Sequence, residues 1–208
     1  MEQYHKIQTV FLRDPETKFK TLLYGQYAKP EFEYLKDNKW IFTEKVDGTN
    51  IRVMFDGSTI TFGGKTDRAQ MPGPLVTRLQ ETFLPQADKF ADKFPDGVCL
   101  YGEGFGGKIQ KASSTYGMSQ DFALFDVKIG DYWLYRENVE EIAKEFGLIV
   151  APVIGRGNLA YMVSIAQSGY NSAWGEFHAE GVVARPDVEL TNRYGERVIT
   201  KLKYKDFN

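Results

Sequence analysis

The stretch EKVDGTNIRV (44–53) sets a lysine, Lys45, just before an aspartate and a glycine. Apolar residues on both sides predict strands over 40–45 and 50–56, and Asp47-Gly48 predicts a turn that joins them as a hairpin. Lys45 would then lie at the mouth of the hairpin. A lysine amine is a nucleophile only when neutral, and because free lysine titrates at about 10.4, neighbouring cations or burial must lower its pKa. The KxDG pattern alone is short, and a surface lysine beside a turn is its ordinary explanation.

Four later stretches carry residues of catalytic type, in the order YGEG, LFDV, EGVVAR and KLK. Glu180 opens the apolar strand of EGVVAR, where an unpaired carboxylate would be costly, so we expect a lysine or Mg²⁺ as its partner. Strand alternation places Lys201 and Lys203 of KLK on one face, with Leu202 opposite. For each of these residues alone, a salt bridge or an exposed basic strand is the commoner explanation.

The other two stretches contain Glu103 and Phe125. Glu103 lies between two glycines, which we expect to leave room for the backbone to approach a ligand. Phe125 shares a strand face with Ala123 and Val127 by alternation, and a place in the core is the ordinary expectation for a phenylalanine.

In their order and spacing, these five motifs resemble the covalent nucleotidyltransferases, the family of ATP-dependent DNA ligases, RNA ligases and mRNA capping enzymes. The resemblance covers residues 44–203, and KVDGTN looks like the motif of the nucleophilic lysine. Glu44 and Asn50, in the KxxGTN form, favour enzymes of the RNA ligase 2 type. Asp47 departs from that type and is the residue of DNA ligases and capping enzymes.

The resemblance implies a role for each candidate residue. Lys45 would carry a covalent AMP, and Lys201 and Lys203 would supply positive charge around it. Glu180 would contact the metal, and Glu103 would contact the ribose through metal-bound water. An adenine contact is implied for Phe125, and Glu44 is expected to accept a hydrogen bond from the adenine amino group. Asn50 and Arg52 project to one side of their strand, and both are expected to reach phosphate. Arg68 is a further candidate for a contact to phosphate or to the nucleic acid, with Lys65 as its rival.

The implied function is an ATP-dependent RNA ligase that joins 5′-phosphate and 3′-hydroxyl ends through lysyl-AMP. The implied cofactors are ATP and Mg²⁺ or Mn²⁺, and the implied partner is RNA or a nicked duplex, as in RNA repair. Alternatives are a DNA ligase, which Asp47 favours, a capping guanylyltransferase, and a nucleotide-binding module without turnover. Intact Lys45, Glu180 and Lys201 argue against the last of these.

Composition limits the class of protein. The chain has 208 residues, 42% of them hydrophobic, which predicts one folded domain. A net charge of −2 and a single cysteine argue against a globally basic nucleic-acid binder, a disulfide framework and the usual zinc sites. Since no apolar run reaches membrane-spanning length and the N-terminus is polar, we expect an intracellular, cytoplasmic monomer without a membrane partner, of cellular or viral source.

The predicted elements indicate an α+β fold of mainly antiparallel sheets flanked by helices, the nucleotidyltransferase (ATP-grasp-like ligase adenylation) fold by resemblance. Helices are expected at 75–83, 139–146 and 159–166. We expect a single adenylyltransferase domain over 1–208, with no C-terminal OB-fold or helical domain. Strands are expected at 40–45, 50–56, 58–64, 97–104, 121–127, 132–135, 148–153, 180–186 and 197–204.

Overall fold

The computed structural model describes residues 2–110 and 113–207. It has mixed α and β structure dominated by antiparallel sheets, as the sequence predicts. Contacts along the chain divide it into two compact units, the first Met1–His5 with Asp47–Ala151 and the second Lys6–Val46 with Pro152–Asn208. The expectation of a single domain over 1–208 stays a prediction. Among the described residues, no helix is both long and apolar enough to cross a membrane.

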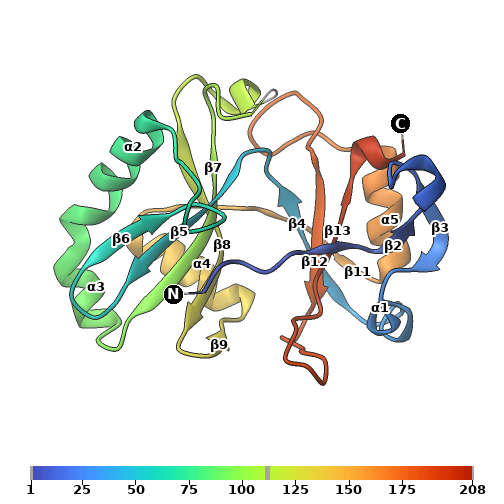
Figure 1. Ribbon diagram of the computed structural model, residues 1–208, viewed down its shortest axis with the longest axis horizontal. Coiled ribbons are helices and arrows are strands. Elements are labelled where there is room, and N and C mark those ends of the chain that lie inside the picture. The colour runs from blue at the N-terminus through green and yellow to red at the C-terminus, as the bar shows by residue number, and fades with distance from the viewer. Residues whose placement is uncertain (1, 111–112, 208) are drawn as a thin grey trace. The chain divides into compact units, whose positions relative to one another are not determined.

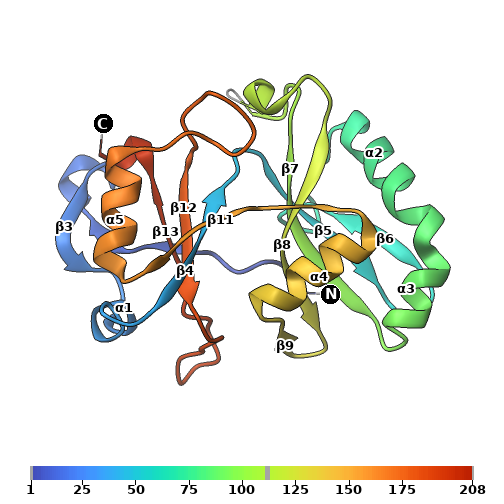
Figure 2. The ribbon, with the colours of Figure 1, turned by 180° about the vertical axis from the view of Figure 1, so that it is seen from behind.

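The first unit is a sheet in the order β10-β8-β7-β5-β6, with β9 paired to β8 (Figure 1). Phenylalanines and aliphatic residues on one face of this sheet pack against three helices, which Figure 2 shows from the side opposite to Figure 1. The helices are α2 (Gly73–Phe83), α3 (Ala87–Lys93) and α4 (Arg136–Phe146), and the strands are β5 (Thr49–Phe55), β6 (Ile60–Gly63), β7 (Val98–Phe105), β8 (Asp121–Ile129), β9 (Tyr132–Trp133) and β10 (Ile149–Val150).

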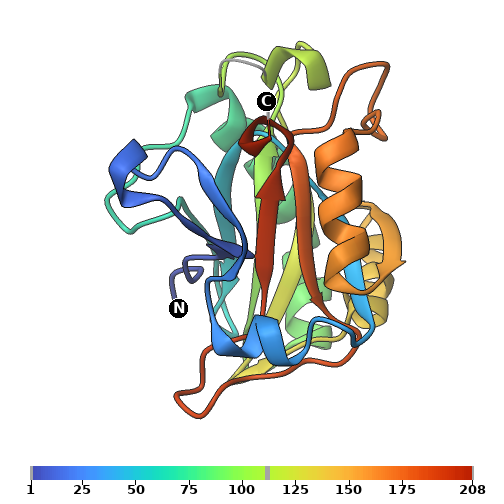
Figure 3. The same cartoon turned by 90° about the vertical axis from the view of Figure 1, so that its right-hand side faces the viewer.

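The second unit is a sheet in the order β1-β13-β12-β4-β11, with a hairpin of β2 and β3 beside it. Helix α5 lies along β12 and β13 (Figure 3), and its apolar residues share a core with one face of the sheet. The strands are β1 (Gln8–Thr9), β2 (Phe11–Arg13), β3 (Leu22–Tyr27), β4 (Trp40–Lys45), β11 (Val153–Gly157), β12 (Gly181–Pro186) and β13 (Thr200–Lys203), and the helices are α1 (Pro30–Tyr34) and α5 (Leu159–Ser168).

Three helices were predicted from apolar periodicity, and all three form. The stripe of α4 that ends at Phe146 is buried, and Gly147 stops the helix with a φ of 65°, a left-handed conformation that favours glycine. The N-cap of α5 is Asn158, whose side chain accepts a hydrogen bond from the backbone N–H of Tyr161. Local signals therefore suffice for these helices.

Two strand predictions are wrong. The predicted hairpin of 40–45 and 50–56 does not form, because β4 pairs with β11 and β12 while β5 pairs with β6 and β7. The chain passes from the second unit to the first between Val46 and Asp47. The single strand expected at 148–153 is two strands in different sheets, β10 and β11, separated by Ala151 and Pro152.

Candidate functional site

Strand β4 sends alternate side chains to opposite faces of the second unit's sheet. Trp40 and Phe42 face the core beneath α5, and Glu44 follows on the same face. Lys45 therefore lies on the opposite face. Its register partner in β12 is Gly181, whose partner in β13 is Lys203.

Lys45 and Lys203 share one carboxylate. The Nζ atom of Lys45 lies 2.5 Å from Oε2 of Glu180, and the Nζ atom of Lys203 lies 2.5 Å from Oε1. The side chains of Lys45, Glu180 and Lys203 are 19%, 14% and 25% exposed, so the cluster is largely shielded but open to solvent. The lysine partner expected for Glu180 is confirmed. Leu202 is in the core as predicted, and Lys201 alternates with it on the face of Lys203.

The backbone around Glu180 brings its carboxylate to this place. The carbonyl of Glu180 accepts a hydrogen bond of 2.9 Å from the N–H of Tyr204, directly after β13. A Cβ atom at Gly181 would lie 2.1 Å from the carbonyl oxygen of Leu202, so glycine is required for β12 and β13 to approach this closely. The hydroxyl of Tyr170 donates a bond of 2.6 Å to the carbonyl of Gly181.

The two ammonium groups keep Glu180 ionised. Burial alone would raise the pKa of this carboxyl, but the charge of Lys45 and the hydrogen bonds from Lys203 and Lys45 outweigh burial and hold the pKa below its ordinary value. We expected the positive charges of Lys201 and Lys203 to crowd the amine of Lys45. Instead, a carboxylate lies between Lys45 and Lys203 and pairs with both.

Glu44 has a different environment although it precedes Lys45 directly. It is 2% exposed, and its oxygens accept hydrogen bonds from the hydroxyl of Ser172 at 2.6 Å and the N–H of Ala173 at 2.9 Å. Burial raises the pKa of Glu44, and these two hydrogen bonds only partly oppose the increase. Glu44 thus ties the segment after α5 to β4, and its contact to adenine stays a prediction.

In the first unit, Asn50 of β5 and Glu103 of β7 are register partners. The amide oxygen of Asn50 is buried and has no hydrogen-bond partner in the part of the chain that the structure describes, so a ligand donor could satisfy it. The two glycines beside Glu103 leave room for core side chains. A Cβ atom would lie 2.3 Å from the ring of Phe122 at Gly102 and 2.5 Å from Leu75 at Gly104. The expected close approach of this backbone to a ligand stays a prediction.

The predicted phosphate contacts differ in accessibility. Arg52 is 1% exposed and donates hydrogen bonds to the carbonyl of Gly64 at 3.0 Å and to Asp67 at 2.7 Å. It therefore fixes the turn after β6. Arg68 and Lys65 lie in that turn and are exposed. Each of these phosphate contacts stays a prediction.

Phe125 lies at a β-bulge, where the pairing of β7 with β8 shifts between Tyr101 and Gly102. Val127 packs in the same core as Leu124, three residues earlier, so simple alternation fails and the expected shared face of Phe125 and Val127 is wrong. The ring of Tyr4 lies 5.1 Å from that of Phe125 at an angle of 71°. The hydroxyl of Tyr4 also donates a bond of 2.5 Å to Asp126.

Sequence reasoning missed Tyr4, Ser172, Arg13 and Asp206. Tyr4 contacts Asp126, and Ser172 contacts Glu44, across more than a hundred residues of chain. No local pattern marks such residues, because each owes its position to pairing between distant segments.

The residues present fit a Mg²⁺ ion that is held mostly by phosphate and water. Within 2–110 and 113–207, no three His, Cys, Asp or Glu side chains gather into a metal-binding cluster. Mg²⁺ usually takes one or two protein carboxylates and completes its shell with water and substrate phosphates. Glu180 can provide one carboxylate, since each of its oxygens keeps a second lone pair beside the lysine hydrogen bond. Glu103 is the predicted metal contact of the first unit.

Comparisons with known proteins identify the family and the fold. The family model described as RNA ligase matches residues 38–203. An apo variant of Naegleria gruberi RNA ligase superposes with a TM-score of 0.72 at 16% identity, covering 100% of this chain and 56% of that one. The same enzyme with PPi, and a variant with ATP and Mn, each give a TM-score of 0.70 at 16% identity, covering 98% of this chain and 56% of theirs.

At this identity the structural likeness shows the fold, and the chain spans little more than half the length of these solved proteins. No curated protein sequence gives a significant match. The family match covers most of the chain and runs from before Lys45 to Lys203. This chain belongs to the RNA ligase family.

Proposed function

We propose that the chain is an ATP-dependent RNA ligase that joins a 5′-phosphate end to a 3′-hydroxyl end. The observation that carries the proposal is the cluster in which Lys45 and Lys203 share the carboxylate of Glu180 on one face of a sheet. A second cation beside a candidate nucleophilic lysine is what nucleotidyl transfer needs, because that reaction depends on positioning and on offsetting phosphate charge.

In the first step, the neutral amine of Lys45 attacks the α-phosphorus of ATP. A P–N bond forms, the bond to the β-phosphate oxygen breaks, pyrophosphate leaves, and the nitrogen loses a proton. Lys203, and Lys201 on the same strand face, offset the charge that builds on the phosphates. Mg²⁺ or Mn²⁺, when bound, supplies further positive charge to the phosphates.

In the second step, an oxygen of the RNA 5′-phosphate attacks the AMP phosphorus, the nitrogen takes up a proton, and the P–N bond breaks to restore the amine of Lys45. In the third step, the 3′-hydroxyl loses its proton and attacks the activated 5′-phosphate, a phosphodiester forms, and the bond to AMP breaks so that AMP leaves. All three steps are transfers at phosphorus, so one cationic site serves each of them.

The ion pair of Lys45 with Glu180 sets a requirement for the first step. An ammonium has no lone pair to attack with, so the proton on Lys45 must leave before the P–N bond forms. The phosphates of bound ATP are anions that compete with Glu180 for both lysines. We infer that nucleotide binding rearranges this cluster and that adenylylation accelerates as the pH rises above neutrality.

The test is incubation with α-labelled ATP and Mg²⁺, followed by mapping of the covalent adduct. We expect AMP on Lys45 and no label in the variant Lys45→Ala. The control is Lys39→Ala, which should be labelled normally. Lys39 also pairs with a carboxylate, that of Asp187 at 3.0 Å, but its side chain is 62% exposed. Persistent labelling of Lys45→Ala would refute the assignment. Labelling by GTP and not by ATP would favour a capping guanylyltransferase.

A second measurement addresses the nucleic acid. Sealing is compared on single-stranded RNA, and on nicked duplexes whose 3′-hydroxyl strand is RNA or DNA. Since the 2′-hydroxyl distinguishes these strands, we expect the RNA strand to be preferred. Equal or faster sealing of DNA would make this chain a DNA ligase by activity.

A further inference from the structure

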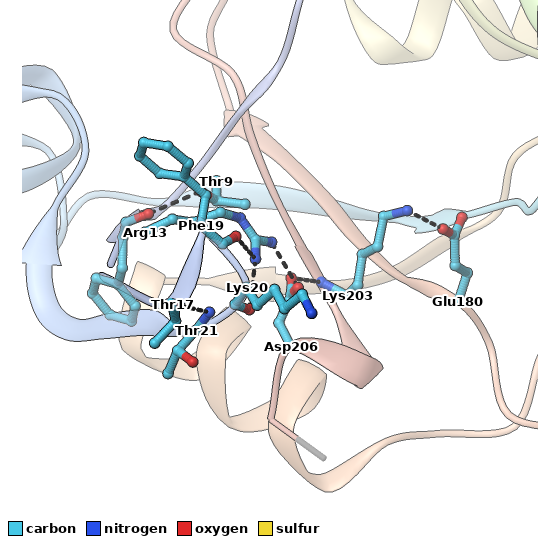
Figure 4. A network of polar contacts seen from close by, with 10 residues as sticks. Thr9, Arg13, Thr17, Phe19, Lys20, Thr21, Glu180, Lys203 and Asp206 are labelled. Carbon is cyan, nitrogen blue, oxygen red and sulfur yellow. Dashed lines mark hydrogen bonds and ion pairs between the residues drawn. The ribbon is translucent and has the colours of Figure 1, made fainter. Parts of the chain in front are cut away.

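Asp206 joins Lys203 to the opposite end of the chain. Asp206 lies in the short helix η4 (Tyr204–Asp206) directly after β13, and its side chain is 5% exposed. One carboxylate oxygen, Oδ2, accepts a hydrogen bond of 2.9 Å from the backbone N–H of Lys203. The other, Oδ1, pairs with the guanidinium of Arg13 at 2.6 Å. Figure 4 shows the resulting chain of contacts from Arg13 through Asp206 and Lys203 to Glu180.

Arg13 is itself held by the turn between β2 and β3. Its Nη1 atom donates to the carbonyl of Lys20 at 3.2 Å and, more weakly, to that of Phe19 at 3.4 Å (Figure 4). Lys18 and Phe19 have φ angles of 56° and 60°, which non-glycine residues rarely adopt, so the turn is held in one specific shape. Arg13 thus makes three directed contacts, and a guanidinium with fixed N–H directions suits such a role.

The contact to Asp206 replaces a missing sheet partner. The pairing of β1 with β13 joins Gln8 to Thr200 and Thr9 to Lys201, and the N–H of Val10 donates to the carbonyl of Lys201. The backbone N–H of Lys203, two residues further on, is bonded to a side chain instead. On the β1 side, the last residue of β13 is therefore fixed by the Arg13–Asp206 pair, while on its other side it pairs with Gly181 of β12.

We propose that Arg13 and Asp206 are positioning residues for Lys203, and that they fix its backbone so that its amine meets the phosphates during transfer to Lys45. This inference rests on the proposed function. A lysine side chain has four rotatable carbon bonds, so its reach and direction depend on a fixed starting point. A displacement of about 1 Å at a reacting group can lower a rate ~10²-fold.

The kinetic test measures the rate of Lys45 adenylylation at saturating ATP. We expect Asp206→Ala to lower the rate ~10-fold or more, and Asp206→Asn, which keeps an acceptor for the Lys203 N–H, to lower it less. Asp187→Ala is the matched control, since Asp187 also pairs with an arginine, Arg156, at 2.6 Å in the same unit. The control is expected to label at the wild-type rate.

A double-mutant cycle separates positioning from general destabilisation. If Asp206 acts through Lys203, then Asp206→Ala has no further effect on the rate in a Lys203→Ala background. An equal loss in both backgrounds would overturn the proposal, because it would show that Asp206 acts on the fold as a whole. Arg13→Gln is expected to follow the pattern of Asp206→Asn.

Amide hydrogen exchange tests whether Asp206 fixes the backbone of Lys203, and this measurement needs no catalysed reaction. In Asp206→Ala the amide of Lys203 is expected to exchange at least ~10-fold faster, while that of Val182 in the middle of β12 keeps its protection. Unchanged exchange at Lys203 would overturn the positioning role of Asp206 even if ATP labels the wild-type chain. A wild-type chain that takes no label from ATP would instead refute the proposed function. Faster exchange of the Lys203 amide in the variant would then still show that Asp206 fixes this backbone.

Discussion

Replacing Glu180 by glutamine tests the charge cluster most directly. The substitution keeps the size of the side chain but removes the negative charge between Lys45 and Lys203. The amide oxygen of glutamine can accept a hydrogen bond from one lysine, while its NH₂ group cannot accept one from the other. Two ammonium groups then remain close together with one neutral acceptor.

The expected loss of stability follows from the exposure of the cluster. Removing one partner of a fully buried ion pair costs ~3–5 kcal/mol, and an exposed pair contributes ~0–1 kcal/mol. With side chains 14% to 25% exposed, the cluster lies between these limits, and we expect a loss of about 2 kcal/mol in the free energy of unfolding at pH 7. For a urea m-value of about 2 kcal/mol/M, the midpoint would fall by about 1 M.

The pH dependence of this loss has a definite sign. The pKa of Glu180 in the folded chain lies below its ordinary value of 4.5, so its stabilising contribution is present above about pH 4.5 and disappears as the pH falls through the folded pKa. The difference in the free energy of unfolding between wild type and Glu180→Gln should therefore have its full size at pH 7 and become smaller below pH 4.5. Urea titrations at several pH values measure it.

Glu44→Gln is the matched control, with the opposite slope. Because burial raises the pKa of Glu44, its contribution is present below about pH 4.5 and is lost as the pH rises through the folded pKa. A Glu180→Gln difference that stays constant or grows toward acid would refute the assignment of two lysine partners to Glu180. Parallel slopes for the two variants would do the same.

Two further substitutions test the packing. Gly181→Ala should lower the free energy of unfolding by ~1–3 kcal/mol, measured by urea unfolding, because the added Cβ would meet the carbonyl of Leu202. Gly73→Ala is the control. A Cβ at Gly73 would have no atom of another described segment within 4 Å, so the free energy of unfolding should stay the same or rise. Arg52→Met should cost ~2–3 kcal/mol and expose the turn at Gly64 to proteolysis, because a charge-assisted hydrogen bond is lost there. If the turn at Gly64 resists proteolysis in Arg52→Met as well as in the wild type, Arg52 does not fix this turn.

The fold class and the three helices with clear apolar stripes could be predicted, because periodicity and stop signals such as Gly147 are local. The passage of the chain from the second unit to the first, between Val46 and Asp47, could not be predicted. The chain from Lys45 to Thr49 carries an ordinary turn signal, and only the pairing of β4 with β11 and β12 prevents a hairpin. The strands β1, β2 and β3 have no strong alternation, and β1 depends on a distant partner, β13.

For the site, sequence indicated the lysine partner of Glu180, because a carboxylate at the start of an apolar strand needs one. It did not indicate that Glu180 would separate Lys45 from Lys203, since that requires the register of β12 against both β4 and β13. Nothing in the sequence around Asp206, which follows Lys201, Lys203 and Lys205, marks it for a special role. Its role depends on Arg13, which lies 193 residues earlier.

Glu44 and Lys45 show why this register matters. A carboxylate next to a lysine in sequence would be its natural ion-pair partner, yet strand alternation sends Glu44 to the α5 face and Lys45 to the other. Glu44 is then free to hold Ser172, and Lys45 pairs with Glu180, which also holds Lys203. A slip of one residue in β4 would exchange the two side chains and bury the ammonium of Lys45 beneath α5. The hydrophobic pattern of Trp40 and Phe42 therefore fixes the place of Lys45 as firmly as any contact of the lysine itself.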